Sequence, residues 1–143
     1  MNKLKLLNRP AILQIYLPLI IGGFIYLGFR STSLLMFKYF KFLGMQQAIE
    51  KLRVFVNPLS DGLPEWVIFS LPDGLWTFAF VAYILQVNGG RPSNWLALPV
   101  IFSIGVELAQ MTQYVPGTFD YIDLIISILA LALSYNLNKK KYK

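Results

Sequence analysis

The chain has 143 residues, of which 56% are hydrophobic and 14% are charged, and its mean hydropathy is +0.55. A soluble domain of this length carries about 25% charged residues and cannot bury so much apolar surface, so we expect lipid to cover the excess. The formal net charge of +6 comes from Lys and Arg residues scattered between apolar stretches. This is not the contiguous basic surface of a nucleic-acid-binding protein, and we expect membrane lipids rather than nucleic acid as partners.

Cysteine and histidine are both absent from the chain. Without cysteine there is no disulfide, thiolate nucleophile or cysteine metal site. Without histidine there is no Ser-His-Asp triad and no histidine-ligated zinc or haem. We therefore expect no metal, no cofactor and no covalent catalysis, and any chemistry would depend on carboxylates, hydroxyls, Lys, Arg or Tyr.

The first predicted element is a transmembrane helix at residues 11–29. A basic start, with Lys3, Lys5 and Arg9, precedes an apolar run. At about 19 residues the run is too long for the hydrophobic part of a signal peptide, and no small-residue cleavage site follows it. We expect this segment to be a retained span.

Pro18 and the Gly22–Gly23 pair within this span permit a kink and the close approach of a second helix. Small residues are common where helices meet in membranes. We interpret them as packing residues rather than functional ones.

Residues 31–65 follow, and with Lys38 and Lys41 they are too charged to cross a membrane. Helical periodicity predicts an amphipathic interfacial helix at about residues 33–56, lying on the outer leaflet with its aromatic lead at headgroup depth. A helix that docks on a partner protein is the alternative. The apolar stripe consists of Met45, Ala48, Ile49, Leu52 and Val56.

Three further stretches, at residues 72–87, 96–114 and 121–137, approach the roughly 20 residues that span a bilayer as helix. The first of them is short unless residues 66–71 join it, and Pro72-Asp73-Gly74 interrupts that join, so a broken or re-entrant start fits as well. The predicted fold is all-α: a single-domain integral membrane bundle of four transmembrane helices with one interfacial helix.

The distribution of Lys and Arg predicts the orientation of the bundle. Eight of them fall at the two ends and in the second connection, against five in the other two connections. Because basic residues accumulate on the cytoplasmic side, we expect a multi-pass protein of the bacterial inner membrane with both termini cytoplasmic. All the acidic residues then fall at or toward the outer side: Glu50, Asp61, Glu65, Asp73, Glu107, Asp120 and Asp123.

Glu107 is the strongest candidate for a functional residue. It lies with Gln110 in an otherwise apolar span, and a carboxylate at that depth by default faces the bundle interior or a water-filled cavity. Ser103 and Tyr114 share its helix face, and Gln113 lies beyond Gln110. Protonation, hydrogen bonds from these neighbours, or a Lys or Arg from the outer loop could each neutralise Glu107.

Asp73, Asp120 and Asp123 each stand where a helix is predicted to begin, so each could simply cap a helix or favour its dipole. With Glu107 they could instead wall an outward-facing cleft that holds a cation or an amine-bearing ligand. The predicted ligand-binding residues are Asp73, Glu107, Gln110, Gln113, Asp120 and Asp123.

The pattern Glu107-x-x-Gln110, followed by Pro116-Gly117 and by Asp123, resembles the signature of the VanZ-like family of bacterial membrane proteins. The resemblance covers roughly residues 70–135, with Asp73 in the place of that family's acidic residue before the second span. It implies a small multi-helical membrane protein and, as in some members, reduced susceptibility to glycopeptide antibiotics such as teicoplanin.

This chain departs from the family pattern at two counter-charges. Thr118 lies in the region where the family commonly has an Arg, and Gly74-Leu75-Trp76 follows the first Asp where the family often has a His. Pairing of Glu107 with those two residues therefore cannot be carried over.

The predicted function is that of a VanZ-like membrane protein whose acidic cleft binds or modulates a cell-envelope component, such as a lipid-linked or amine-bearing ligand. One alternative is an accessory subunit of a membrane complex, with the polar stripe docked on another membrane protein. A second is an intramembrane enzyme using Glu107 with Asp73 or Asp123 as acid and base. A proton- or cation-coupled transporter is a third. The ligand, the oligomeric state and the existence of a reaction stay open.

Overall fold

The computed structural model describes residues 9–112 and 118–139, and these are helical without any strand. The expectation of an all-α protein is confirmed for them. In chain order the elements are α1 (Arg9–Phe29), α2 (Leu35–Phe42), α3 (Gln46–Val56), the 3-10 helix η2 (Asn57–Gly62), α4 (Glu65–Phe69), α5 (Leu71–Val87), the 3-10 turn η3 (Asn94–Leu96), α6 (Ala97–Val100), the π-helical segment η4 (Ile101–Gly105), α7 (Val106–Met111) and α8 (Tyr121–Asn138).

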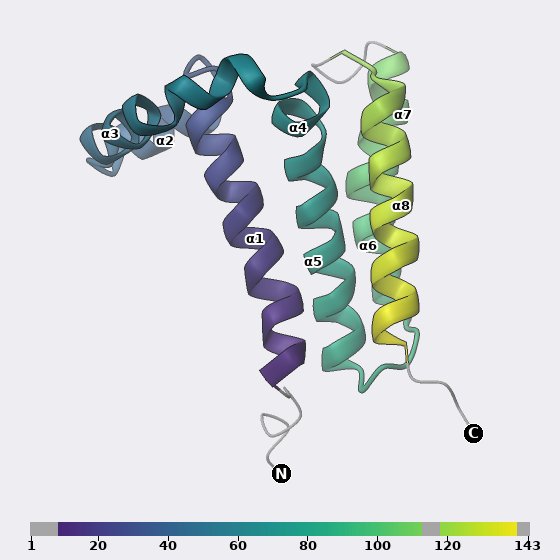
Figure 1. The fold of residues 1–143 in the computed structure, drawn as a ribbon. Helices are drawn as coiled ribbons and strands as arrows, with labels where there is room; N and C mark the ends of the chain where they lie inside the picture. Colours follow the sequence, from purple (N-terminus) through teal and green to yellow (C-terminus); the bar gives the residue numbers. More distant parts are fainter. Residues whose placement is uncertain (1–8, 113–117, 140–143) are drawn as a thin grey trace.

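Three helical stretches of the described residues are long and apolar enough to cross a membrane: Ile12–Phe29, Asn94–Met111 and Tyr121–Asn138. The second of them runs without interruption through η3, α6, η4 and α7, and we call it the composite helix. The apolar helix α5 is shorter, with 17 residues. Figure 1 shows α1, α5 and α8 side by side, with α6 and α7 behind α8 in this view.

The short helix α4 is joined to α5 through a single residue, Ser70, which ends one helix and begins the next. Backbone hydrogen bonds continue across it, from the Ser70 N–H to the Trp66 carbonyl at 3.0 Å and from the Gly74 N–H to the Ser70 carbonyl at 3.2 Å. Pro72 has no N–H, so the helical hydrogen bond that it would donate is missing. Pro72 therefore interrupts the regular helix, but α4 and α5 stay joined through the backbone hydrogen bonds of Ser70.

The expected single interfacial helix at about residues 33–56 is wrong in one respect, because the structure divides it into α2 and α3. Gly44 adopts a positive φ of 74°, which glycine reaches without steric cost. Its N–H donates to the Lys41 carbonyl at 3.0 Å and the Met45 N–H donates to the Phe40 carbonyl at 2.9 Å, the two hydrogen bonds of a Schellman C-cap. The α2–α3 hairpin lies to one side of the bundle (Figure 1).

The hairpin is fastened to the end of α1 by Arg53 and Val56 of α3. The Arg53 guanidinium donates from Nη1 to the carbonyls of Leu27 at 3.1 Å and Arg30 at 2.8 Å, which satisfies backbone groups that the helix end leaves unpaired. Val56 is fully buried, and a Cβ on Gly28 would lie 3.0 Å from its Cγ2. Part of the expected apolar stripe thus packs inward, with Ile49 also buried, whereas Met45 is exposed.

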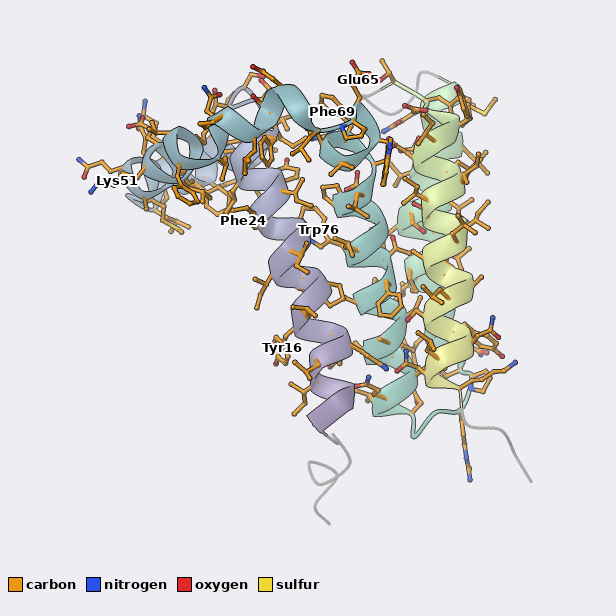
Figure 2. All side chains as sticks on the ribbon, viewed as in Figure 1. Tyr16, Phe24, Lys51, Glu65, Phe69 and Trp76 are labelled. Carbon is orange, nitrogen blue, oxygen red and sulfur yellow. The ribbon has the colours of Figure 1, made fainter. Side chains whose placement is uncertain are left out.

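Helix α5 is the centre of the packing, in contact with α1, α8 and the composite helix. On the α1 side, the Trp76 ring contacts the Tyr26 ring at a tilt of 39°, with ring centroids 5.3 Å apart, and Figure 2 labels Trp76 between the two helices. A Cβ on Gly22 would lie only 2.7 Å from Trp76 Nε1. On the α8 side, a Cβ on Gly74 would overlap the Ile126 side chain. Both glycines are therefore required by the close approach of neighbouring helices.

Replacing Gly22 with Ala tests this packing, and Gly23→Ala is the matched control because nothing lies within 4 Å of its Cβ position. We expect Gly22→Ala to lower the free energy of unfolding in detergent by about 1–3 kcal/mol, the usual cost of overpacking. Gly23→Ala should be neutral or stabilising by up to about 1 kcal/mol, because Ala favours helix. Equal effects of the two substitutions on thermal unfolding would contradict the contact.

Candidate ligand-binding cavities

A cavity of about 360 Å³ lies between α5, the composite helix and α8, and we call it the central cavity. Its volume falls within the range of small-molecule sites. The side chains around it are Asp73, Trp76, Thr77, Phe80, Pro99, Phe102, Ser103, Val106, Glu107, Gln110, Asp123 and Ser127.

A second cavity of about 340 Å³ adjoins it at the end where α4 and the first turn of α8 lie, and we call it the rim cavity. The two cavities share Asp73, Glu107, Gln110 and Asp123. The other residues around the rim cavity are Arg30, Glu65, Trp66, Phe69, Ser70, Thr118, Asp120 and Ile122.

The structure therefore brings together five of the six residues expected to bind a ligand. Four of them line both cavities, and Asp120 lines the rim cavity alone. Gln113 lies outside the described residues.

Asp120 has the capping role that its position allowed. Its Oδ1 accepts a hydrogen bond from the Ile122 N–H at 2.8 Å at the start of α8. Its own N–H donates to Glu107 Oε2 at 3.4 Å, where a capping box would instead use the residue three positions on. Glu107 thus connects the composite helix to the first turn of α8.

Asp123 does not complete the capping box, because Glu107 already occupies the Asp120 N–H. The Asp123 Oδ1 atom is buried, and none of the described residues donates a hydrogen bond to it. A buried polar atom without a partner costs about 1–3 kcal/mol, so the position of Asp123 beside the cavities lowers stability.

Asp73 lies in the first turn of α5, and Ser70 before it makes no side-chain cap. Asp73 interacts electrostatically with Arg30 just after α1, with Asp123 of α8 and with Glu107 of the composite helix. The bundle thus assembles carboxylates that are far apart in the sequence.

Arg30 is the cation of the rim cavity, and the sequence did not single it out. It follows the last residue of α1, donates from Nη1 to the Phe69 carbonyl at 3.3 Å, and lies 5.3 Å from the Phe69 ring and 5.7 Å from the Tyr26 ring. The sequence signal was its place at the end of the first span, on the side where the acids were expected.

The composite helix is irregular where it borders the central cavity. In η4 the Val106 N–H bonds to the Ile101 carbonyl, five residues back, and the Ser103 hydroxyl donates to the Pro99 carbonyl at 2.6 Å. Single π-helical turns are frequent at functional sites because they reorient side chains. Ser103, Glu107 and Gln110 line one cavity as expected, while the predicted participation of Tyr114 lies outside the described residues.

Thr77 is a further member of the central cavity that sequence analysis missed. It is buried and lies one helical turn after Asp73, a spacing that would have revealed it. Ser127, one turn after Asp123, is also buried there. On both α5 and α8, a hydroxyl therefore lies one helical turn after a carboxylate.

The arrangement is rich in hydrogen-bond acceptors and has one guanidinium at its edge. Among the described residues, no three acidic side chains come together closely enough to hold a metal ion. Such a site suits a positively charged organic group that brings its own hydrogen-bond donors.

No protein-family model matches the chain, and no curated protein or solved structure matches it. The chemistry of the two cavities is therefore the basis for functional inference.

The different roles of the two aspartates can be separated by substitution. Asp120→Ala removes the cap of α8 and should lower the free energy of unfolding by about 1 kcal/mol. Asp123→Asn should be neutral or stabilising, because removing the charge beside one buried, unpartnered oxygen outweighs the roughly 0.3–1 kcal/mol that a negative charge gains at a helix N-terminus. Thermal unfolding in detergent measures both, and a larger loss for Asp123→Asn than for Asp120→Ala would contradict these roles.

Proposed function

We propose that the chain is a four-span membrane protein in which α4 and α5 together form the second span. Helix α5 alone is about 26 Å long at 1.5 Å per residue, slightly less than the roughly 30 Å of a bilayer core. The near-continuous α4 supplies the missing length, because only Ser70 separates it from α5.

Both termini face the cytoplasm in this proposal, and the rim cavity opens outward. The start of α1 and the end of α8 lie at one end of the bundle, and the α2–α3 hairpin lies at the other (Figure 1). Exposed apolar side chains of the hairpin support its place in the outer interface, among them Phe42 at 88% exposure and Phe55 at 76%. Lys38 and Lys41 beside them suit phospholipid headgroups.

Cysteine labelling tests the orientation cleanly because the chain has no cysteine of its own. Asp61→Cys, exposed in η2, should react with a membrane-impermeant maleimide in intact cells. Asn94→Cys, exposed at the start of the composite helix, should react only after the cells are permeabilised. The reverse pattern would overturn the orientation.

The function that we propose is binding or modulation of a cell-envelope component by the two cavities, as in a VanZ-like protein linked to glycopeptide resistance. One observation carries this proposal: four residues on which the resemblance depends, Asp73, Glu107, Gln110 and Asp123, line both cavities. Pro116 and Gly117, which also belong to the pattern, lie outside the described residues. They come from α5, the composite helix and α8, so helix capping alone does not account for their convergence.

The test replaces Glu107 with Gln in a bacterial host that expresses the protein. The amide can still accept the hydrogen bond from the Asp120 N–H, so the fold should be kept, but the negative charge is lost. We expect the wild-type protein to raise the inhibitory concentration of teicoplanin and Glu107→Gln to abolish most of the rise, since a hydrogen bond to a charged group is worth about tenfold or more in affinity.

Glu50→Gln is the matched control, because Glu50 is exposed on α3 and lines neither cavity. It should leave the inhibitory concentration unchanged. If Glu107→Gln behaves like wild type in both unfolding and resistance, the site assignment fails. If the wild-type protein gives no rise at all, the link to glycopeptide resistance fails.

A further inference from the structure

An apolar groove of about 420 Å³ lies between α1 and α5, next to the central cavity. Its main side chains are Ile15, Tyr16 and Leu19 of α1 and Trp76, Phe80 and Tyr83 of α5. Trp76 and Phe80 also line the central cavity, so the same two rings border both spaces. Figure 2 shows Tyr16 on α1 and Trp76 on α5.

The groove has the direction and the chemistry of a site for a hydrocarbon chain. From Trp76 to Tyr83 it extends about 10 Å along α5, at 1.5 Å per residue, away from the rim cavity and toward the opposite end of the bundle. Helix α1 packs mainly on α5 and α3 rather than on the composite helix. The groove and the polar cavity are therefore neighbours on the surface of α5.

The charges of the rim cavity favour a zwitterion. Five carboxylates and one guanidinium line it, although the whole chain carries a net charge of +6. The Arg30 guanidinium has five N–H donors, of which one is directed to the Phe69 carbonyl, so it can also bind an anionic oxygen. A ligand with one positive and one negative group matches both parts.

The carboxylates of the two cavities add a second requirement. They accept hydrogen bonds, and a primary ammonium offers three N–H donors, whereas a quaternary ammonium offers none. The positive group is therefore expected to carry N–H bonds.

We propose that the cavities bind a phospholipid with a primary ammonium headgroup. The ammonium lies among Asp73, Glu107 and Asp123, the phosphate lies on Arg30, and an acyl chain follows the groove between α1 and α5. This inference rests on the proposed function and names the class of its ligand.

Trp76 provides the reporter, because it borders both spaces. Trp66→Phe and Trp95→Phe leave Trp76 as the only tryptophan of the full chain, which has three. The protein is placed in phosphatidylcholine bilayers that contain a small fraction of lipid with brominated acyl chains, which quench nearby tryptophan. Brominated phosphatidylethanolamine should quench Trp76 at roughly tenfold lower mole fraction than brominated phosphatidylcholine, since one charge-assisted hydrogen bond separates the two.

Substitutions in the same background identify the groups responsible. Glu107→Gln should remove most of the preference, and Asp123→Asn serves as a second carboxylate variant if Glu107→Gln unfolds. Arg30→Gln should instead weaken the quenching by both brominated lipids, because both carry the phosphate. Asp61→Asn, which is exposed and lines neither cavity, should keep the preference. Equal quenching by the two brominated lipids, or a preference that survives both carboxylate substitutions, would overturn the headgroup assignment.

Soluble phosphoethanolamine distinguishes the lipid from its free headgroup. We expect it not to relieve the quenching, because it lacks the chain that occupies the groove. Full relief by phosphoethanolamine would overturn the role of the groove. Loss of resistance in Glu107→Gln without any lipid preference would overturn this inference while leaving the proposed function in place.

Discussion

The close approach of α5 to its two neighbours is the constraint on which the rest of the structure depends. Gly22 lets the Trp76 ring lie against α1, and Gly74 lets Ile126 of α8 reach the α5 backbone. Because Gly74 directly follows Asp73, the same contact that packs the helices also brings that carboxylate to the side of the bundle where α8 begins. Packing and site geometry therefore have one origin, and a larger residue at position 74 would alter both.

A few interhelical contacts satisfy polar groups among the described residues of the bundle, and one carboxylate oxygen beside the cavities is left without a partner. Ser134 is fully buried and donates to the Phe78 carbonyl at 2.7 Å, which joins α8 to α5 away from the cavities. Near the cavities, the Asp120 N–H donates to Glu107 Oε2, and the Ile122 N–H donates to Asp120 Oδ1. Asp123 is the exception. Its burial without a partner costs stability, which supports the proposal that Asp123 belongs to a ligand-binding site.

The sequence predicted the long helices well, because length and hydropathy are local properties. The expected span at residues 11–29 corresponds to α1, and that at 121–137 corresponds to α8. The division at Gly44 was missed because periodicity on both sides of a glycine continues to look helical. Arg30 and Thr77 were missed for different reasons: the position of Arg30 depends on a contact with Phe69, 39 residues away, whereas the spacing of Thr77 from Asp73 was visible and overlooked.

Arg53 anchors α3 to the end of α1, and it thereby connects the α2–α3 hairpin to Arg30 at the rim cavity. The Arg53 guanidinium donates a hydrogen bond to the Arg30 carbonyl. Helix α3 therefore helps to fix the backbone from which the Arg30 side chain extends. Helices in bilayers of different thickness adjust their tilt to match the hydrocarbon depth. A change in the tilt of α1 would carry Arg30 and the hairpin together relative to Asp73 on α5. Bilayer thickness would thereby set the separation of opposite charges at the rim.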